Sequence, residues 1–296
     1  MLSSREVILS VCVRTFNQRR FIEEALDSVL VQKTSFPFEI IVSDDCSSDG
    51  TVDVLKKYRD RFPETVRLIL GESNVGGPAN LRRVLEASSA KYVSCLDGDD
   101  YYLDEYKLQK QVDFLENHLE FTGCFHNTLN VKVDGTPLSL FNPLDFPAVH
   151  DVRSFIRREW FIPIHSAMFR RSLVSFPDWF ESAMNDDFVV HLSVVKNGPY
   201  YYRPDVMVAY RHHGDNISSV YKDELLSATK LRDILEGFTH IYPEEYLPFL
   251  RERIDLYDKK IASLESERRH PWKKYFKART YVRYIKRLIK TTYHKP

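Results

Sequence analysis

The first hundred residues alternate between strand-like and helix-like segments, and this alternation constrains the fold more than any other feature. Short apolar, β-branched runs predict strands, and the longer amphipathic runs between them predict helices. The expected strands are 7–13, 38–43, 66–70 and 92–96, and the expected helices are 20–31, 51–61 and 78–87. Such alternation is typical of the α/β class, with a mostly parallel, Rossmann-like sheet flanked by helices on both faces.

Polar residues follow each of the expected strands. In parallel sheets the carboxyl ends of the strands form the binding crevice, so these residues are candidates for a site. They are Thr15 and Asn17, Asp44 and Asp45, Asn74, and the run Asp97-Gly98-Asp99-Asp100. Three carboxylates this close together repel one another unless a cation lies among them. We therefore expect Mg²⁺ or Mn²⁺ with a phosphate-bearing substrate at this run, and a solvated acidic loop or helix cap is the alternative.

The second half of the chain has a more mixed pattern. We expect strands at 121–133, 161–169 and 200–210, helices at 104–118 and 186–196, and a loop with a short helix over 136–160. From Glu224 onward the chain reads as helical. An apolar stripe with helical spacing runs through Leu247, Leu250, Ile254, Tyr257, Ile261 and Leu264. The stripe predicts a helix packed on the body of the protein, with a homodimer seam over residues 247–264 as the alternative.

Charge is distributed unevenly along a chain that has no net charge. Residues 268–296 contain eleven basic residues and no acid, which leaves 31 basic against 42 acidic residues in 1–267. Aromatic and aliphatic residues lie among the basic ones, so the tail is expected to be an amphipathic helix on an anionic membrane surface. Docking on the acidic body is the alternative, and no motif supports binding to nucleic acid.

The remaining global features suggest a cytoplasmic protein. No apolar run is long enough to span a bilayer, and no signal-peptide pattern is recognised at the start. Four cysteines without metal-ligand spacing look like small core residues in a reducing compartment: Cys12, Cys46, Cys95 and Cys124.

Seven short motifs, taken in order, resemble the family 2 inverting glycosyltransferases with the GT-A fold. They are 11–17 (VCVRTFN), 43–51 (SDDCSSDGT), 74–80 (NVGGPAN), 96–100 (LDGDD), 107–115 (KLQKQVDFL), 185–187 (NDD) and 210–218 (YRHHGDNIS). Each motif alone is weak, but seven in register are specific. The resemblance covers about the first 220 residues. It implies a glycosyltransferase domain over 1–220, with a nucleotide-sugar half (1–118) and an acceptor half (119–220), followed by a helical extension over 221–296.

The resemblance also implies roles for the strand-end residues in binding a nucleotide-sugar donor. Asp44 or Asp45 reads the base, with Asp45 preferred, and main chain near Thr15 lies beside the same base. Asn17 and Asn74 belong to the same donor site. In the acidic run, Asp99 is expected to be the metal ligand, Asp97 to contact ribose or sugar hydroxyls, and Asp100 to be structural.

The motifs of the second half supply the remaining roles. Inverting transfer needs a base opposite the leaving group, and the resemblance implies Asp187 as that base, with Asp186 as the runner-up. Capping of a helix start is the structural alternative for both acids. His213, preferred over His212, is expected to bind the metal or the leaving phosphate. Arg211 either holds phosphate or pairs with an acid, and His165 either touches the acceptor or is a core histidine. Two positions depart from the family pattern: Arg14 replaces a frequent proline and Cys46 a frequent glycine.

The function implied by the resemblance is metal-dependent transfer of a sugar, with inversion, in cell-surface polysaccharide synthesis. The donor is a nucleoside diphosphate sugar, expected to be UDP-linked, and the acceptor is a hydroxyl of a saccharide or lipid-linked saccharide. Two rival hypotheses are a sugar nucleotidyltransferase and a non-catalytic nucleotide-sugar-binding scaffold. A glycine-rich basic loop after the first strand would favour the nucleotidyltransferase, and residues 14–17 offer none. A scaffold is expected to lack the base or the metal ligand, and candidates for both are present.

Overall fold

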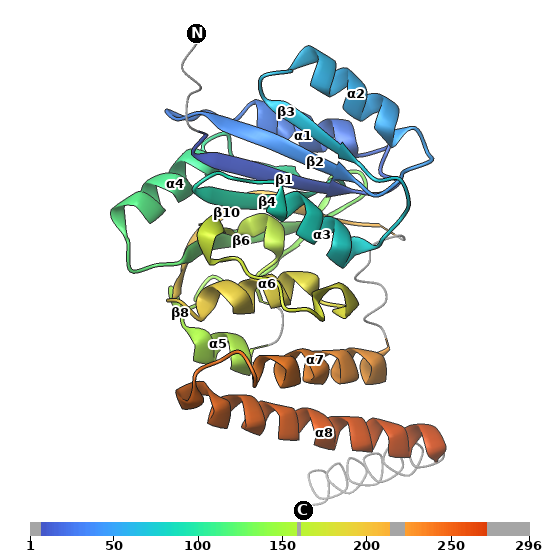
Figure 1. The fold of residues 1–296 in the computed structure, drawn as a ribbon, viewed down its shortest axis with the longest axis vertical. Helices are drawn as coiled ribbons and strands as arrows, with labels where there is room; N and C mark the ends of the chain where they lie inside the picture. The colour runs from blue at the N-terminus through green and yellow to red at the C-terminus, as the bar shows by residue number, and fades with distance from the viewer. Residues whose placement is uncertain (1–6, 159–160, 214–222, 271–296) are drawn as a thin grey trace, which may run out of the picture.

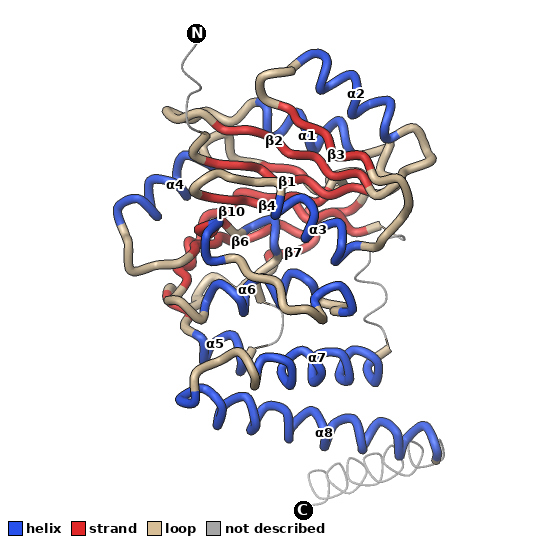
Figure 2. The backbone as a smooth tube through the Cα atoms, viewed as in Figure 1, coloured by secondary structure: helices blue, strands red, loops and turns tan. Residues whose placement is uncertain are grey.

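The computed structural model describes residues 7–158, 161–213 and 223–270 of the 296-residue chain. Within these ranges strands occupy the middle of the upper body and helices surround them (Figure 2). The first half follows the predicted order, with β1 (Leu9–Thr15), α1 (Ile22–Leu30), β2 (Phe38–Asp44), α2 (Thr51–Arg61), β3 (Val66–Leu70), α3 (Gly77–Glu86) and β4 (Tyr92–Asp97). The predicted α/β class is confirmed.

One mixed sheet passes through both halves of the described chain, in the order β3-β2-β1-β4-β9-β6-β10-β5. Its later strands are β5 (Tyr101–Tyr102), β6 (Gly123–Lys132), β9 (Met168–Arg170) and β10 (Tyr200–His212), while β7 (Pro137–Leu140) pairs with β6 and β8 (Val149–His150) with β10. Strands β3, β2, β1 and β4 are parallel to one another, so their carboxyl ends lie at one edge. The antiparallel β9 lies between β4 and β6 and joins the two halves.

Helices cover both faces of the sheet because buried side chains alternate along the strands. On β1, Val11 and Val13 pack in a cluster with α1, α2 and α4 (Lys107–Asn117), whereas Cys12 packs on the opposite face with α3 and α6 (Asp186–Val195). Side chains one residue apart on a strand point to opposite faces. Full burial of each large aliphatic side chain contributes about 1.5–3 kcal/mol to the free energy of folding. The alternation therefore fixes which helices cover which face.

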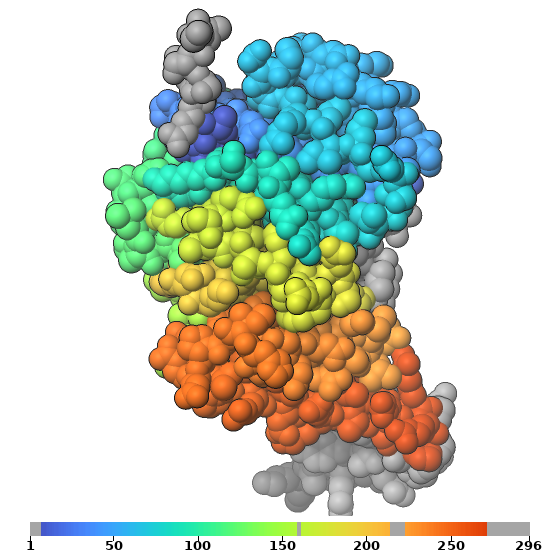
Figure 3. Space-filling view, viewed as in Figure 1, coloured from blue at the N-terminus to red at the C-terminus, as the bar shows by residue number. Residues whose placement is uncertain are grey.

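The C-terminal helices form a separate layer below the sheet (Figure 1). All ten residues of α6 are buried, and beneath it lie α7 (Glu224–Phe238) and α8 (Leu247–Arg269), the lower part of the space-filling view in Figure 3. Leu250 and Tyr257 of the predicted stripe are buried, and the other members pack partly buried against the same cluster. The stripe thus packs on the body of the protein, as the first of its two readings predicted.

Three local expectations were wrong. Residues 161–169 do not form one strand, because Pro163 lacks an N–H donor and the chain turns there into η1 (Ile164–Ser166) before β9 begins. The stretch 136–160 contains β7, β8 and α5 (Val152–Arg157) rather than a loop with one helix. Cys46 is exposed in a loop, so it is not a core residue, unlike the other three cysteines.

Short 3₁₀ helices connect the longer elements of the described chain. Besides η1, the described chain contains the 3₁₀ helices η2 (Arg171–Leu173), η3 (Phe180–Ser182) and η5 (Glu244–Tyr246). Helix α4 begins three residues later than expected because Asp104 closes the preceding turn, accepting the N–H of Tyr106 on its side chain and that of Lys107 on its carbonyl. Among the described helices, none is both long and apolar enough to cross a membrane. The amphipathic helix predicted for the basic tail lies, from residue 271, outside the described residues.

Candidate active site

A cavity of about 430 Å³ lies where β1, β2 and β4 end. Its wall combines residues from the loops after these strands with residues from the second half of the chain. Sequence-predicted members of the wall are Thr15, Asn17, Asp45, Asn74, Asp97, Asp99, His165, Asp186, Asp187 and His213. The parallel register explains the grouping, because Thr15 pairs with Asp44 and Arg14 with Asp97 on the neighbouring strands. The predicted crevice at the strand ends is therefore present as a cavity.

The two acids after β2 have different surroundings. Asp44 is fully buried, and its carboxylate accepts the backbone N–H and the hydroxyl of Ser47, at 2.8 and 2.5 Å. Asp45 lines the cavity, and its oxygens accept the backbone N–H groups of Val75 and Gly76 at 3.0 and 2.8 Å. Gly76 has a φ of 90°, a conformation that favours glycine. Asp45 thus ties the loop after β3 to the wall, while Asp44 closes its own turn.

The acidic run turns tightly against the loop after β1. A Cβ atom at Gly98 would lie 2.5 Å from the side-chain oxygen of Gln18 and 2.9 Å from Cδ1 of Ile22. Only glycine fits without displacing these neighbours. The turn sends its three carboxylates to three different partners, so they do not face one another as a simple acidic patch.

Asp99 and His213 form one of these pairs. Their side chains are each 11% exposed, and Nε2 of His213 lies 2.8 Å from Oδ2 of Asp99. Phe21 stacks on the imidazole with ring centroids 5.1 Å apart, which fixes its orientation. Both side chains line the cavity. One carboxylate oxygen and one imidazole nitrogen that face a cavity suit Mn²⁺ or Mg²⁺, which would complete their shells with substrate oxygens.

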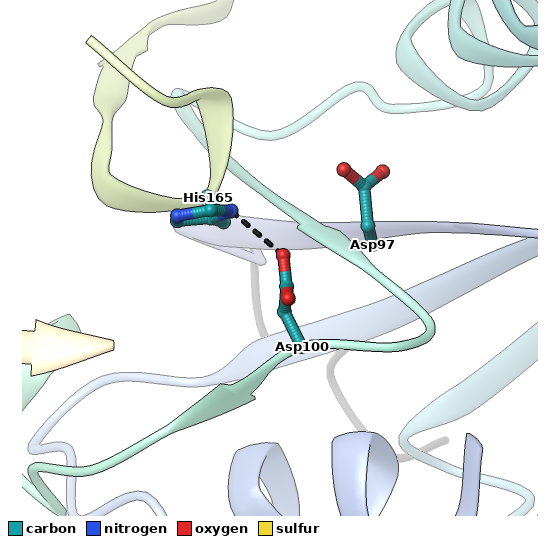
Figure 4. Close-up of side chains that lie close together, drawn as sticks. All are labelled: Asp97, Asp100 and His165. Carbon is teal, nitrogen blue, oxygen red and sulfur yellow. Dashed lines mark ion pairs between the residues drawn. The ribbon is translucent and has the colours of Figure 1, made fainter. Parts of the chain in front are cut away.

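Asp97, Asp100 and His165 form a second group of possible ligands, with one atom from each within 4.8 Å of the others (Figure 4). Asp100 is fully buried, and its carboxylate lies 2.8 Å from Nδ1 of His165 and accepts the backbone N–H of Arg211. Burial raises the pKa of Asp100 to about 7, although His165 acts in the opposite direction. These partners hold the Asp100 carboxylate in the core, and the Arg14 cation on Asp97 opposes a second cation there. The Asp99–His213 pair fits a metal better.

Arg14 connects the end of β4 to the start of α6. Its Nε and Nη2 atoms donate to the two carboxylate oxygens of Asp97, and its Nη1 donates to Oδ2 of Asp186 at 2.5 Å. Burial would raise the pKa of Asp97, but the guanidinium outweighs it and holds that pKa below its ordinary value. For Asp186 burial dominates, and the pKa is raised despite Arg14. Sequence reasoning noted Arg14 as a departure from the family pattern but assigned it no role.

Asp186 and Asp187 begin α6 at the cavity wall. Oδ1 of Asp186 accepts the N–H of Asp187, and Oδ1 of Asp187 accepts the N–H of Phe188, at 2.9 and 2.8 Å. Each acid therefore also satisfies a backbone donor of the first turn, where negative charge is favourable. The structure accordingly places both acids in the cavity wall and at the start of a helix.

Three other predicted residues lie close to the cavity. Arg211 is buried, is not among the lining residues and donates to Oε2 of Glu24 at 2.6 Å, which is the contact expected from its acid-pairing alternative. His212 points elsewhere, with Nε2 2.9 Å from Oδ1 of Asn130. His165 is buried but lines the cavity. Sequence reasoning missed Phe21 as a lining residue, because nothing in its local pattern marks it, and it included Tyr210 in a motif without assigning it a role.

Comparison with known proteins decides the family. The model of glycosyl transferase family 2 matches residues 10–175, more than half of the chain. The chain belongs to glycosyl transferase family 2. It is similar to the uncharacterized protein Rv1520 of Mycobacterium tuberculosis, at 36% identity over 216 residues, which are 73% of this chain and 62% of Rv1520. It is also similar to the Staphylococcus aureus poly(ribitol-phosphate) β-N-acetylglucosaminyltransferase TarS, at 28% identity over 228 residues, 72% of this chain and 37% of TarS. The chain thus spans less than two thirds of the length of either relative.

Solved structures confirm the GT-A fold that the family resemblance predicted. Residues 1–349 of S. aureus TarS in complex with UDP-GlcNAc superpose with a TM-score of 0.58 at 19% identity, covering 85% of this chain and 80% of that one. The mannosyltransferase PcManGT of Pyrobaculum calidifontis, in complex with GDP-Man and Mn²⁺, has a TM-score of 0.59 at 17% identity, covering 99% and 89%. At these identities the similarity establishes the fold alone.

Proposed function

We propose that this protein is a metal-dependent inverting glycosyltransferase. It transfers a sugar from a nucleoside diphosphate sugar, UDP-linked in our proposal, to a hydroxyl of a saccharide or lipid-linked saccharide in cell-surface polysaccharide synthesis. One observation carries the proposal: a single cavity gathers Asp45, the Asp99–His213 pair and the two acids of α6. These are the groups needed at the base, the diphosphate and the acceptor hydroxyl. The relatives and the similar structures named for sugar transfer support it.

At the donor end, Asp45 would read the base and Asp99 with His213 would hold the metal. Asp45 is preferred over Asp44 because it lines the cavity, whereas Asp44 is fully buried and is not among the lining residues. A divalent cation, Mn²⁺ or Mg²⁺, would neutralise the charge that develops on the leaving diphosphate. Asp97 would contact hydroxyl groups of the ribose or the sugar. Arg211 supports this end indirectly, donating at 2.6 Å to the carbonyl oxygen of Asp99.

At the acceptor end, Asp187 would accept the proton of the attacking hydroxyl. The oxygen of that hydroxyl then bonds to the anomeric carbon as the bond to the diphosphate breaks, which inverts the configuration. Asp187 is preferred because it is the better match to the base position that the family resemblance implies, while Asp186 binds Arg14 at 2.5 Å. Both acids come from α6, whose complete burial holds them rigidly against the cavity. A rigid support is what a catalytic carboxylate needs, since small displacements lower the rate strongly.

The experiment is an assay of nucleoside diphosphate release with a panel of donors that includes UDP-GlcNAc and GDP-mannose, with and without Mn²⁺. We expect turnover of one donor, dependence on metal, and an inverted anomeric configuration of the product by ¹H NMR. Asp99→Ala should abolish turnover, whereas Asp53→Ala, an exposed acid on α2, should retain it. Binding of a donor without turnover under any condition would instead support the non-catalytic scaffold.

We also propose a cytoplasmic location, with the basic tail from residue 268 on an anionic membrane surface. The described start of the tail shows a contact with the body, because Arg268 donates to both carboxylate oxygens of Asp223 at 2.8 and 2.6 Å. Membrane contact by the tail is tested by flotation with anionic liposomes, in which the full chain is compared with a chain that ends at residue 267. Equal flotation of the two forms would show that the tail does not bind the membrane.

A further inference from the structure

Arg14 is placed by the sheet where two functional segments meet. It is the neighbour of Asp97 in the parallel register of β1 and β4, so both side chains emerge on the same face. Cys12, two residues earlier, packs in the cluster that contains α6. Because side chains two residues apart share a face, Arg14 points toward the start of that helix. Its guanidinium is then within reach of Asp186, 172 residues away in the sequence.

The bridge made by Arg14 is partly withdrawn from water. The side chains of Arg14, Asp97 and Asp186 are 16%, 24% and 11% exposed. The planar guanidinium holds Asp97 with two donors and Asp186 with a third, an arrangement that the single ammonium of lysine cannot reproduce. Without the cation, the carboxylates of Asp97 and Asp186, which contact the same guanidinium, would face each other directly in the cavity wall. Repulsion would then move β4 and α6 apart or change their protonation.

We propose that Arg14 is a positioning residue that sets the distance between the donor-sugar carboxylate and the catalytic base. It ties the end of β4, which presents Asp97, to the first residue of α6, and it occupies Asp186. Consecutive residues of a helix point about 100° apart, so holding Asp186 fixes the direction of Asp187. Arg14 thereby decides which acid of the pair meets the acceptor hydroxyl. This inference rests on the proposed function for its kinetic part only.

The kinetic test compares Arg14→Met and Arg14→Lys with the wild type. We expect Arg14→Met to lower kcat about 10- to 100-fold and to change the Kd for UDP less than threefold, since misplacement of reacting groups by about 1 Å costs about 100-fold. Arg14→Lys should recover part of kcat, and added guanidinium ion should partly restore the methionine variant. The matched control is Arg170→Met, which removes an arginine bound to the carbonyls of Phe121 and Leu115 and is expected to show no guanidinium rescue.

A double-mutant cycle with Asp186→Asn tests the bridge itself. If Arg14 acts through Asp186, the losses of kcat and the decreases in Tm of Arg14→Met and Asp186→Asn should not add. Additive effects, a kcat of folded Arg14→Met within threefold of the wild type, or an equal loss of UDP binding would each overturn the proposal. The Tm cycle needs no turnover. A wild type without turnover would therefore refute the proposed function, while additive Tm changes would refute the bridge independently.

Discussion

Separate replacement of Asp186 and Asp187 by asparagine should distinguish a catalytic role from a structural one, because the two variants should differ in which they lose more of, activity or stability. Asp187→Asn removes the proposed base but leaves a side-chain oxygen that can still accept the N–H of Phe188. Loss of a positioned general base typically costs about 10²–10⁴ in rate, or about 3–5 kcal/mol of activation free energy. The loss of stability should be small, since one charge near a helix N-terminus contributes about 0.3–1 kcal/mol.

Asp186→Asn should show the opposite balance. Its Oδ2 accepts from Arg14 at 2.5 Å, and its other oxygen accepts the N–H of Asp187. An amide cannot accept both bonds, so one charge-assisted hydrogen bond is lost. Such a bond contributes about 1.5–3 kcal/mol, and we expect this decrease in the free energy of unfolding. Activity should fall less than in Asp187→Asn, because only the placement of the neighbouring base is disturbed.

The assay pairs initial rates of nucleoside diphosphate release with urea unfolding followed by circular dichroism. Both variants should bind UDP like the wild type, which excludes collapse of the donor site as a cause of lost activity. A folded Asp186→Asn variant with a larger loss of kcat than Asp187→Asn would refute the assignment and make Asp186 the base. Equal losses of activity and stability in the two variants would refute the separation of roles.

Four further outcomes are expected. Asp99→Asn should raise the Mn²⁺ concentration for half-maximal activity at least about tenfold, because one of the two proposed protein ligands is weakened. An unchanged metal titration would contradict the proposed metal site. Gly98→Ala should destabilise by about 1–3 kcal/mol and raise the donor KM, since a Cβ would lie 2.5 Å from Gln18, 2.9 Å from Ile22 and 3.0 Å from Thr15. A neutral effect in urea unfolding would show that these side chains can move aside. Leu250→Ala, at a fully buried position of α8, should lower the free energy of unfolding by about 2–5 kcal/mol in the same measurement. A loss of less than about 1 kcal/mol would mean that the packing of α8 contributes little to stability. Burial lowers the pKa of Lys107 to about 7, so between pH 7 and 10 the unfolded chain holds a proton that the folded chain lacks. The free energy of unfolding of the wild type, relative to that of Lys107→Met, should therefore rise with pH by up to about 1.4 kcal/mol per pH unit. A difference between the two proteins that does not change with pH would refute the lowered pKa.

The periodic parts of the fold were predictable from the sequence because their signals are local. A strand such as β1 and a helix such as α2 differ in side-chain period, and a window of about ten residues contains that information. The stretch 161–169 was mispredicted for the same reason. Its apolar residues are buried, as in a strand, but Pro163 and the turn of η1 place them in irregular backbone. Burial and backbone conformation are separate properties, and an apolar run reports only the first.

Site residues were predictable where the strand order places them, and not where their role depends on a partner elsewhere in the chain. Asp45 and Asp99 lie at strand ends, and the topology of a parallel sheet brings such ends together whatever the details of packing. Cys46 shows a further local constraint, since its φ of 66° is the left-handed conformation where the family often has glycine. The roles of Asp44 and Arg211 depended on partners, Ser47 and Glu24, that the resemblance did not identify.

The sequence by itself determined the α/β class, the family and the residues that line the strand ends, because these follow from local periodicity and short motifs. Only the tertiary structure decided how the charges are paired. Arg14 meets Asp97 and Asp186 across separations of 83 and 172 residues, and Asp100 meets His165 in the core. Which of many carboxylates and cations become partners depends on atomic distances in the folded chain. A direct ion pair needs its two groups within a few ångströms of each other, and those distances exist only after folding.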